Sequence, residues 1–171
     1  MKFKNVVYEY SLAKAILDGF VKEPAAGTRK DFDPKHYSQE DIDRLKLEDG
    51  IRIHEETKIA LDIYARDNNV RQVKPFVLVV AKDTRHATGL KDLITSDAFF
   101  KGYYADKVME IHSAQRGAEK EENIEQLISL ESPDNRIEIV IHVNMLKEGW
   151  DVTNLYTIIP LRSAASATLR E

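Results

Sequence analysis

The chain has 171 residues, of which 43% are hydrophobic and 32% are charged, so it can bury a core beneath a well-solvated surface. Its formal net charge of −4 disfavours strong autonomous binding to nucleic acid, because affinity for a phosphate backbone depends largely on a surplus of cations. It contains no cysteine, no signal-peptide pattern and no apolar run long enough to cross a membrane. We therefore expect no disulfide, no contact with a membrane and a cytoplasmic location.

The first 50 residues are expected to form an inter-domain connection and a linker. Val6–Tyr10 predicts a short strand, and Ser11 can cap a short helix that ends at Gly19. Residues 22–37 contain proline, glycine and scattered charge, which is the composition of a linker.

Two helices are expected next. The first begins at about Ser38, and in the second three residues share one face: Ile53, Ala60 and Tyr64.

Residues 51–171 are expected to form one α/β domain. Strand-like apolar runs alternate with helical patterns, which is typical of βα units on a parallel sheet. The predicted strands are Phe76–Ala81, Lys107–Ile111, Arg136–Val143 and Leu155–Pro160. The first of them is apolar without interruption, as expected of a strand that is covered on both faces.

Helices are expected between these strands. Asp83 can cap the first helix, and four apolar residues share one of its faces: Ala87, Leu90, Leu93 and Ile94. The second helix is rich in Glu and Lys, and its predicted buried stripe is Ile124, Leu127 and Ile128. Residues 166–171 begin another helical segment.

The loop after the third of these strands is the most informative segment. The strand ends at Val143, and a polar loop with one glycine leads to the next strand at Leu155. Ligands of open α/β sheets lie at the carboxyl ends of the strands. Gly149 permits a positive φ or the close approach of a ligand, and Asp151 can accept hydrogen bonds from ribose hydroxyls. From spacing alone, an ordinary capped βα loop is the alternative interpretation.

This segment also resembles a known motif. Residues 139–160, IVIHVNMLKEGWDVTNLYTIIP, resemble motif V of superfamily-two helicases, and residues 146–152 resemble the form found in the Res subunit of type III restriction enzymes. Residues 8–19 resemble the segment that leads from the first motor domain of such proteins into the second. Residues 75–83 resemble motif IV, and residues 108–113 resemble motif IVa. The resemblance covers nearly the whole chain, in the right order.

The resemblance implies a RecA-like domain of the P-loop NTPase type, with a mostly parallel sheet flanked by helices and a helical N-terminal extension. It implies the second motor domain of an ATP- and Mg²⁺-dependent helicase and site-specific endonuclease. The expected partners are the first RecA-like domain of the same polypeptide, DNA and a modification (methyltransferase) subunit. The residues expected on the nucleotide side are Gly149, Asp151 and Glu148, and those expected on the DNA-backbone side are His112, Ser113, His142 and Asn144.

One departure concerns His142, which stands where many relatives carry a threonine that touches a nucleic-acid phosphate. A histidine can also donate a hydrogen bond to phosphate, but a structural role for His142 remains an open alternative.

Other parts of the helicase pattern do not occur in the sequence. The chain has no Gly-x-x-x-x-Gly-Lys-Ser/Thr and no Asp-Glu-x-His, so it is not expected to hold ATP phosphates or Mg²⁺ alone. Motif VI, with its arginine finger, is expected to follow Leu169–Glu171 in the parent chain. We therefore expect no catalytic residue and no activity in these 171 residues by themselves. Two alternatives stay open: a related ATPase of DNA repair or RNA metabolism without a nuclease, and a non-enzymatic RecA-like binding or scaffold domain.

Two further patterns are incomplete. His54 and Glu55 begin like a zinc-protease helix, but Lys58 stands where the second histidine ligand is needed. Asp134 and Glu138 suggest a nuclease pattern that would need a lysine at the position of Val140. We therefore predict no metal site from either pattern.

Overall fold

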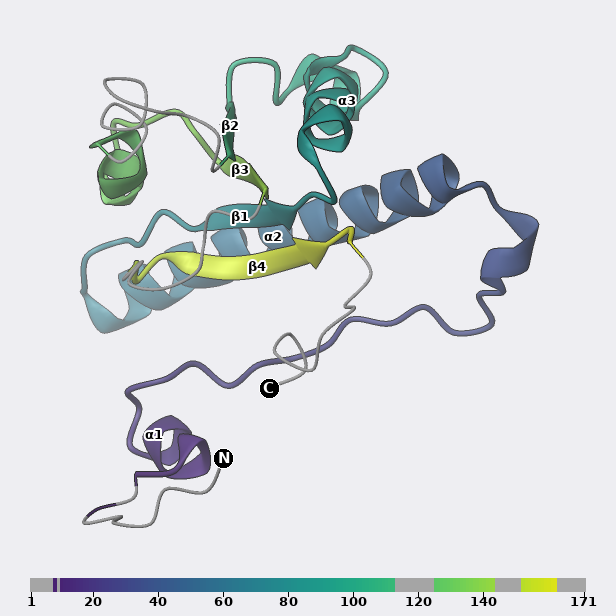
Figure 1. The fold of residues 1–171 in the computed structure, drawn as a ribbon. Helices are drawn as coiled ribbons and strands as arrows, with labels where there is room; N and C mark the ends of the chain where they lie inside the picture. The colour runs from purple at the N-terminus through teal and green to yellow at the C-terminus, as the bar shows by residue number, and fades with distance from the viewer. Residues whose placement is uncertain (1–7, 9, 113–124, 144–151, 163–171) are drawn as a thin grey trace. The chain divides into compact units, whose positions relative to one another are not determined.

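A computed structural model describes residues 8, 10–112, 125–143 and 152–162 of the chain. The chain divides into two compact units, residues 1–36 and residues 37–171, and each is described by itself (Figure 1).

The first unit contains one short helix, α1 (Leu12–Leu17). As predicted, Ser11 caps it, because its side chain accepts a hydrogen bond from the backbone N–H of Lys14. The helix stops before Gly19, whose φ of +79° is a conformation that glycine adopts without strain. The predicted strand at Val6–Tyr10 falls mostly outside the described residues.

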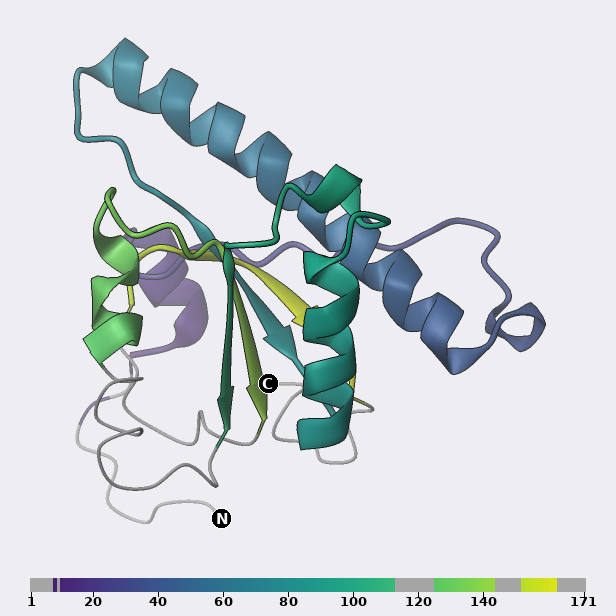
Figure 2. The same cartoon turned by 90° about the horizontal axis from the view of Figure 1, so that it is seen from above.

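The second unit contains a four-stranded sheet in which every described strand pairing is parallel. Its strands are β1 (Phe76–Val80), β2 (Val108–His112), β3 (Ile139–Val143) and β4 (Leu155–Pro160), in the spatial order β2-β3-β1-β4 (Figure 2). All four predicted strands are confirmed, although β3 begins at Ile139 and not at Arg136. The predicted α/β class with a parallel sheet is therefore correct.

One long helix, α2 (Gln39–Asn68, 30 residues), replaces the two helices that the sequence predicts, and that prediction is wrong. It begins with a capping box between Ser38 and Asp41 and ends at Asn69, which adopts a left-handed conformation with a φ of 51°. Gly50 does not break it, because the helix packs there against Ile159 of β4 at a distance that leaves no room for a Cβ.

The buried face of α2 also differs from the one that periodicity suggests. Its buried residues are Asp43, Leu47, Gly50, Ile51, His54 and Ala65. Ile53, Ala60 and Tyr64, which do share a face of the helix, are exposed.

One face of the sheet is covered by α2 and by α3 (Thr84–Thr95). As predicted, Asp83 caps α3, and Ala87, Leu90 and Ile94 are buried with Leu93 partly buried. These side chains share a core with Leu47 and Ile51 of α2 and with one face of each central strand.

The other face of the sheet is covered by residues 125–131, of which 125–128 are helical and Ser129–Glu131 form a 3₁₀ turn. Leu127 and Leu130 pack there on Phe76, Leu78, Met109, Ile111 and Val140. Leu127 was predicted to be buried, but Ile128 is 70% exposed, so that part of the predicted stripe is wrong. Leu130 takes its place because the chain tightens from an α-helical to a 3₁₀ turn at Ser129.

Two further 3₁₀ turns are Pro34–His36 in the first unit and Phe100–Gly102 in the second. No described helix is long and apolar enough to cross a membrane.

Candidate functional site

The order of the strands creates a candidate binding edge between β1 and β3. After β1 the chain passes through α3 to β2, which lies beyond β3. After β3 the chain passes to β4, which pairs with the side of β1 that faces away from β3. The two connections therefore leave neighbouring strands in opposite directions. This is the arrangement in which open α/β sheets form a ligand crevice at their carboxyl ends.

The turn from β1 into α3 is closed by its own side chains. The carboxylate of Asp83 accepts a hydrogen bond from the backbone N–H of His86 at 2.8 Å. A carboxylate at this position occupies the place that a ligand phosphate takes at a helix N-terminus. The β1 turn is therefore not arranged as a phosphate cradle.

His86 joins this turn to α2. Its Nε2 lies 3.0 Å from a carboxylate oxygen of Asp43, which is buried, and its Nδ1 accepts a hydrogen bond from the backbone N–H of Lys82 at 3.1 Å. Because Nδ1 accepts, the neutral ring must carry its proton on Nε2 and donate to Asp43. Both ring nitrogens are used within the protein, so His86 positions the turn and has no nitrogen left for proton transfer to a ligand.

His142, a predicted phosphate contact, lies in β3 at the same edge and pairs in register with Val80 and Ile111. Its side chain is only 4% exposed. Burial, assisted by the positive charge of Arg162, lowers the pKa of His142 to about 4. The ring is therefore neutral at physiological pH, and its Nδ1 has no hydrogen-bond partner among the described residues. These features favour the structural alternative for His142.

Of the other predicted site residues, the described part of the chain includes only His112, which lies at this edge. His112 ends β2 and pairs in register with Val143, the last residue of β3. The parallel sheet thus brings the ends of two predicted DNA-contacting segments side by side. The remaining predicted residues lie outside the described part of the chain: Ser113, Asn144, Glu148, Gly149 and Asp151.

A second polar cluster lies at the opposite, amino edge, and the sequence did not predict it. Glu138 directly precedes β3, and its carboxylate contacts Lys58 at 2.8 Å, Lys107 at 2.9 Å and His54 at 3.4 Å. Burial raises the pKa of Glu138, but the hydrogen bonds with His54, Lys58 and Lys107 outweigh burial and hold that pKa well below its usual range. Glu138 is therefore a buried anion that is held by cations.

Glu55 extends this cluster. It accepts hydrogen bonds from Lys58 at 2.9 Å and from the hydroxyl of Tyr104 at 2.5 Å. Burial and the hydrogen bond to Glu55 raise the pKa of Tyr104 far above its usual value, so this hydroxyl stays protonated. Lys107 lies 3.4 Å from the centre of the Tyr103 ring, a cation–π contact.

The cluster includes a triad that resembles a set of metal ligands. Ligand atoms of His54, Glu55 and Glu138 lie within 4.8 Å of one another. However, the ammonium group of Lys58 already bridges the two carboxylates, so it occupies the place of a cation. The donor set therefore does not fit a metal ion.

Comparisons of the chain with protein-family models, with curated proteins and with solved structures found no match.

Proposed function

We propose that this chain is the second RecA-like motor domain of the helicase subunit of a type III restriction enzyme. In this proposal it closes on ATP and DNA together with a first motor domain. The observation that carries the proposal is the strand order β2-β3-β1-β4, which sets the crevice between β1 and β3. The segment that resembles motif V, residues 144–151, follows β3 directly in the sequence.

The closed turn after β1 supports the same proposal. A first motor domain would need a glycine-rich phosphate cradle at that turn, whereas here Asp83 caps α3 and the turn residues are Ala81, Lys82 and Asp83. A second motor domain instead meets nucleotide that another domain holds. In the proposed parent enzyme, ATP supplies the free energy of the motor cycle, and Mg²⁺ is held outside these 171 residues.

The experiment is ATP turnover by the parent enzyme with Gly149→Ala or Asp151→Ala. Both variants should lower DNA-stimulated turnover by at least about tenfold, Asp151→Ala through one lost charged hydrogen bond and Gly149→Ala because a Cβ obstructs the close approach of a ligand. Both should keep the circular-dichroism spectrum of the wild type. Asp134→Ala is the matched control, since Asp134 lies in an exposed turn near the start of β3. Wild-type turnover in both variants would refute the assignment of the crevice.

A second measurement separates the proposal from its nearest alternative. With the modification subunit present, the parent enzyme should cut unmodified DNA in an ATP-dependent reaction. ATP-dependent movement on DNA or RNA without cutting would instead identify a related ATPase of repair or RNA metabolism. If the parent shows neither turnover nor movement, the non-enzymatic scaffold alternative holds.

A further inference from the structure

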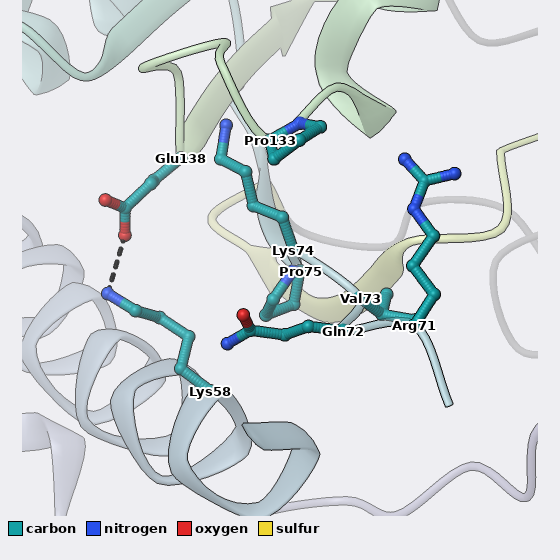
Figure 3. A pocket seen from close by; sticks show the side chains of 8 residues that line it. All are labelled: Lys58, Arg71, Gln72, Val73, Lys74, Pro75, Pro133 and Glu138. Carbon is teal, nitrogen blue, oxygen red and sulfur yellow. Dashed lines mark hydrogen bonds and ion pairs between the residues drawn. The ribbon is translucent and has the colours of Figure 1, made fainter. Parts of the chain in front are cut away.

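A hollow of about 390 Å³ opens at the amino edge of the sheet, opposite the edge of the proposed nucleotide crevice (Figure 3). It lies between the later part of α2, residues 71–75 that lead into β1, and Pro133 and Glu138 that precede β3. Three of its lining side chains are cations, namely Lys58, Arg71 and Lys74, and Glu138 is its one lining carboxylate.

Lys58 retains a hydrogen-bond donor for a ligand. An ammonium group has three N–H donors, and Lys58 directs two of them at the carboxylates of Glu55 and Glu138. Glu138, in turn, already accepts from Lys58 on one oxygen and contacts Lys107 with the other. Both oxygens of the Glu138 carboxylate therefore already interact with cations of the protein.

Lys74 is a cation without a counter-ion. Its ammonium group donates to the backbone carbonyls of Asn135 and Ile137, and in the described part of the chain it forms no ion pair. Burial lowers the pKa of Lys74, and the positive charges of Lys107 and Lys58 lower it further against the opposing effect of Glu138. An anion in the hollow would raise the pKa of Lys74 again, because it favours the charged ammonium group. It would also accept a hydrogen bond from the third N–H of that group.

The backbone around Lys74 is fixed. The side-chain amide of Asn154, which is 2% exposed, donates to the carbonyl oxygens of Lys74 at 2.9 Å and of Leu130 at 3.0 Å. The backbone of Lys74 is therefore held by Asn154, the residue before β4, as well as by the start of β1.

Arg71 completes the wall with an exposed guanidinium group that makes no hydrogen bond to the described residues. Glu131 is close enough for its charge to interact with Arg71, but the two side chains form no ion pair or hydrogen bond in the described structure. The planar fork of Arg71 stays available, and such a fork matches the oxygens of a phosphate group.

We propose that this hollow binds the phosphate group of a small ligand. Three cations (Lys58, Arg71 and Lys74) and one carboxylate (Glu138) line it, within a chain whose formal net charge is −4. Its free groups are donors, and a phosphate group is rich in acceptors, so the two are complementary.

The test is calorimetric titration of the 171-residue chain with inorganic phosphate and with ribose 5-phosphate, at constant ionic strength. Arg71→Glu should weaken binding by at least about tenfold, the equivalent of one lost charged hydrogen bond. Lys74→Met should weaken it similarly, and circular dichroism reports whether each variant is folded. Lys46→Glu, an equal change of charge at an exposed position of α2 outside the hollow, should leave binding unchanged.

The comparison of ligands identifies the source of the phosphate. Tighter binding of ribose 5-phosphate than of inorganic phosphate identifies a phosphorylated metabolite, and equal binding identifies free phosphate. Four outcomes would overturn the proposal: no binding of either ligand, no change on Arg71→Glu, an equal loss on Lys46→Glu, or binding of a DNA oligonucleotide alone.

Discussion

His142 links the stability of the domain to pH. The pKa of this buried ring, about 4, lies below the usual histidine value of 6.5 that applies to an unfolded chain. Between these two pH values, the unfolded state therefore binds a proton that the folded state does not bind. The stabilising effect of the neutral ring is complete above pH 6.5 and is lost as the pH falls towards 4.

We therefore expect the free energy of unfolding to fall between about pH 6.5 and pH 4, by up to about 3 kcal/mol. His142→Gln should flatten this slope, because glutamine does not titrate. His36→Gln is the matched control, since the side chain of His36 is 79% exposed. Denaturant titrations at several pH values measure the slope, and an equal slope in wild type and His142→Gln would contradict the assignment.

Glu138 changes the stability of the domain with pH in the same direction as His142, but over a lower pH range. Its pKa is lowered in the folded state, so its contribution to stability is present above the unfolded value of 4.5 and is lost only in stronger acid. At neutral pH its charge holds Lys58 and Lys107 together across α2 and the sheet.

Replacing Glu138 with glutamine should destabilise the domain by about 3 kcal/mol, since it leaves two partly buried ammonium groups without their shared carboxylate. Asp62→Asn is the control, because it breaks only the exposed ion pair with Arg66 and should cost less than about 1 kcal/mol. Urea unfolding measures both variants. Equal losses in the two would show that the Glu138 cluster contributes no more than a surface pair.

At the scale of the elements, the contact between α2 and β4 depends on a glycine. A Cβ on Gly50 would lie 2.6 Å from Cγ1 of Ile159, a residue that is 4% exposed and has little freedom to move. Steric conflict in a packed core outweighs the better helix propensity of alanine.

Gly50→Ala should therefore destabilise the domain by about 1–3 kcal/mol, and Ile159→Val in the same chain should recover part of the loss. Gly89→Ala in α3 is the matched control. A Cβ there meets nothing within 4 Å, so this substitution should stabilise by about 0.5–1 kcal/mol. Thermal or urea unfolding measures all three variants, and a stabilising Gly50→Ala would refute the packing argument.

The same elements show how far the sequence predicts this fold. The four strands and α3 were predicted correctly because their signals are local: continuous apolar runs, and a capping residue before an apolar periodicity. The prediction of two helices failed at α2, because the feature that keeps the helix continuous at Gly50 is a contact with Ile159, more than a hundred residues away in the sequence. Packing of this kind leaves no local pattern.

The two candidate sites also differ in how far the sequence predicts them. The carboxyl edge was predictable, because parallel strands bring the ends of successive βα units together. The Glu138 cluster was not, because its closest histidine lies 84 residues away in the chain. The one local signal was a single acid between Ile137 and Ile139, at the start of an apolar strand. An acid in that position needs buried partners, but the sequence does not say which ones.

At the scale of the whole molecule, the proposed function predicts that the chain is inactive by itself. It has no phosphate-binding glycine motif and no surplus of cations. The purified 171 residues should therefore neither hydrolyse ATP nor bind duplex DNA tightly at physiological salt. Coupled ATPase and fluorescence-anisotropy assays measure this. Turnover that disappears on Asp151→Ala would contradict it.

The length of α2 has a mechanical consequence. Asp43 anchors its first part to His86 at the carboxyl edge, and Lys58 anchors its later part to Glu138 at the amino edge, about 22 Å further along the helix axis. Gly50 lies between these anchors, where a Cβ would meet the side chain of Ile159 in β4. One continuous helix therefore carries an ion pair to each edge of the sheet, so the two candidate sites share an element although they share no residue.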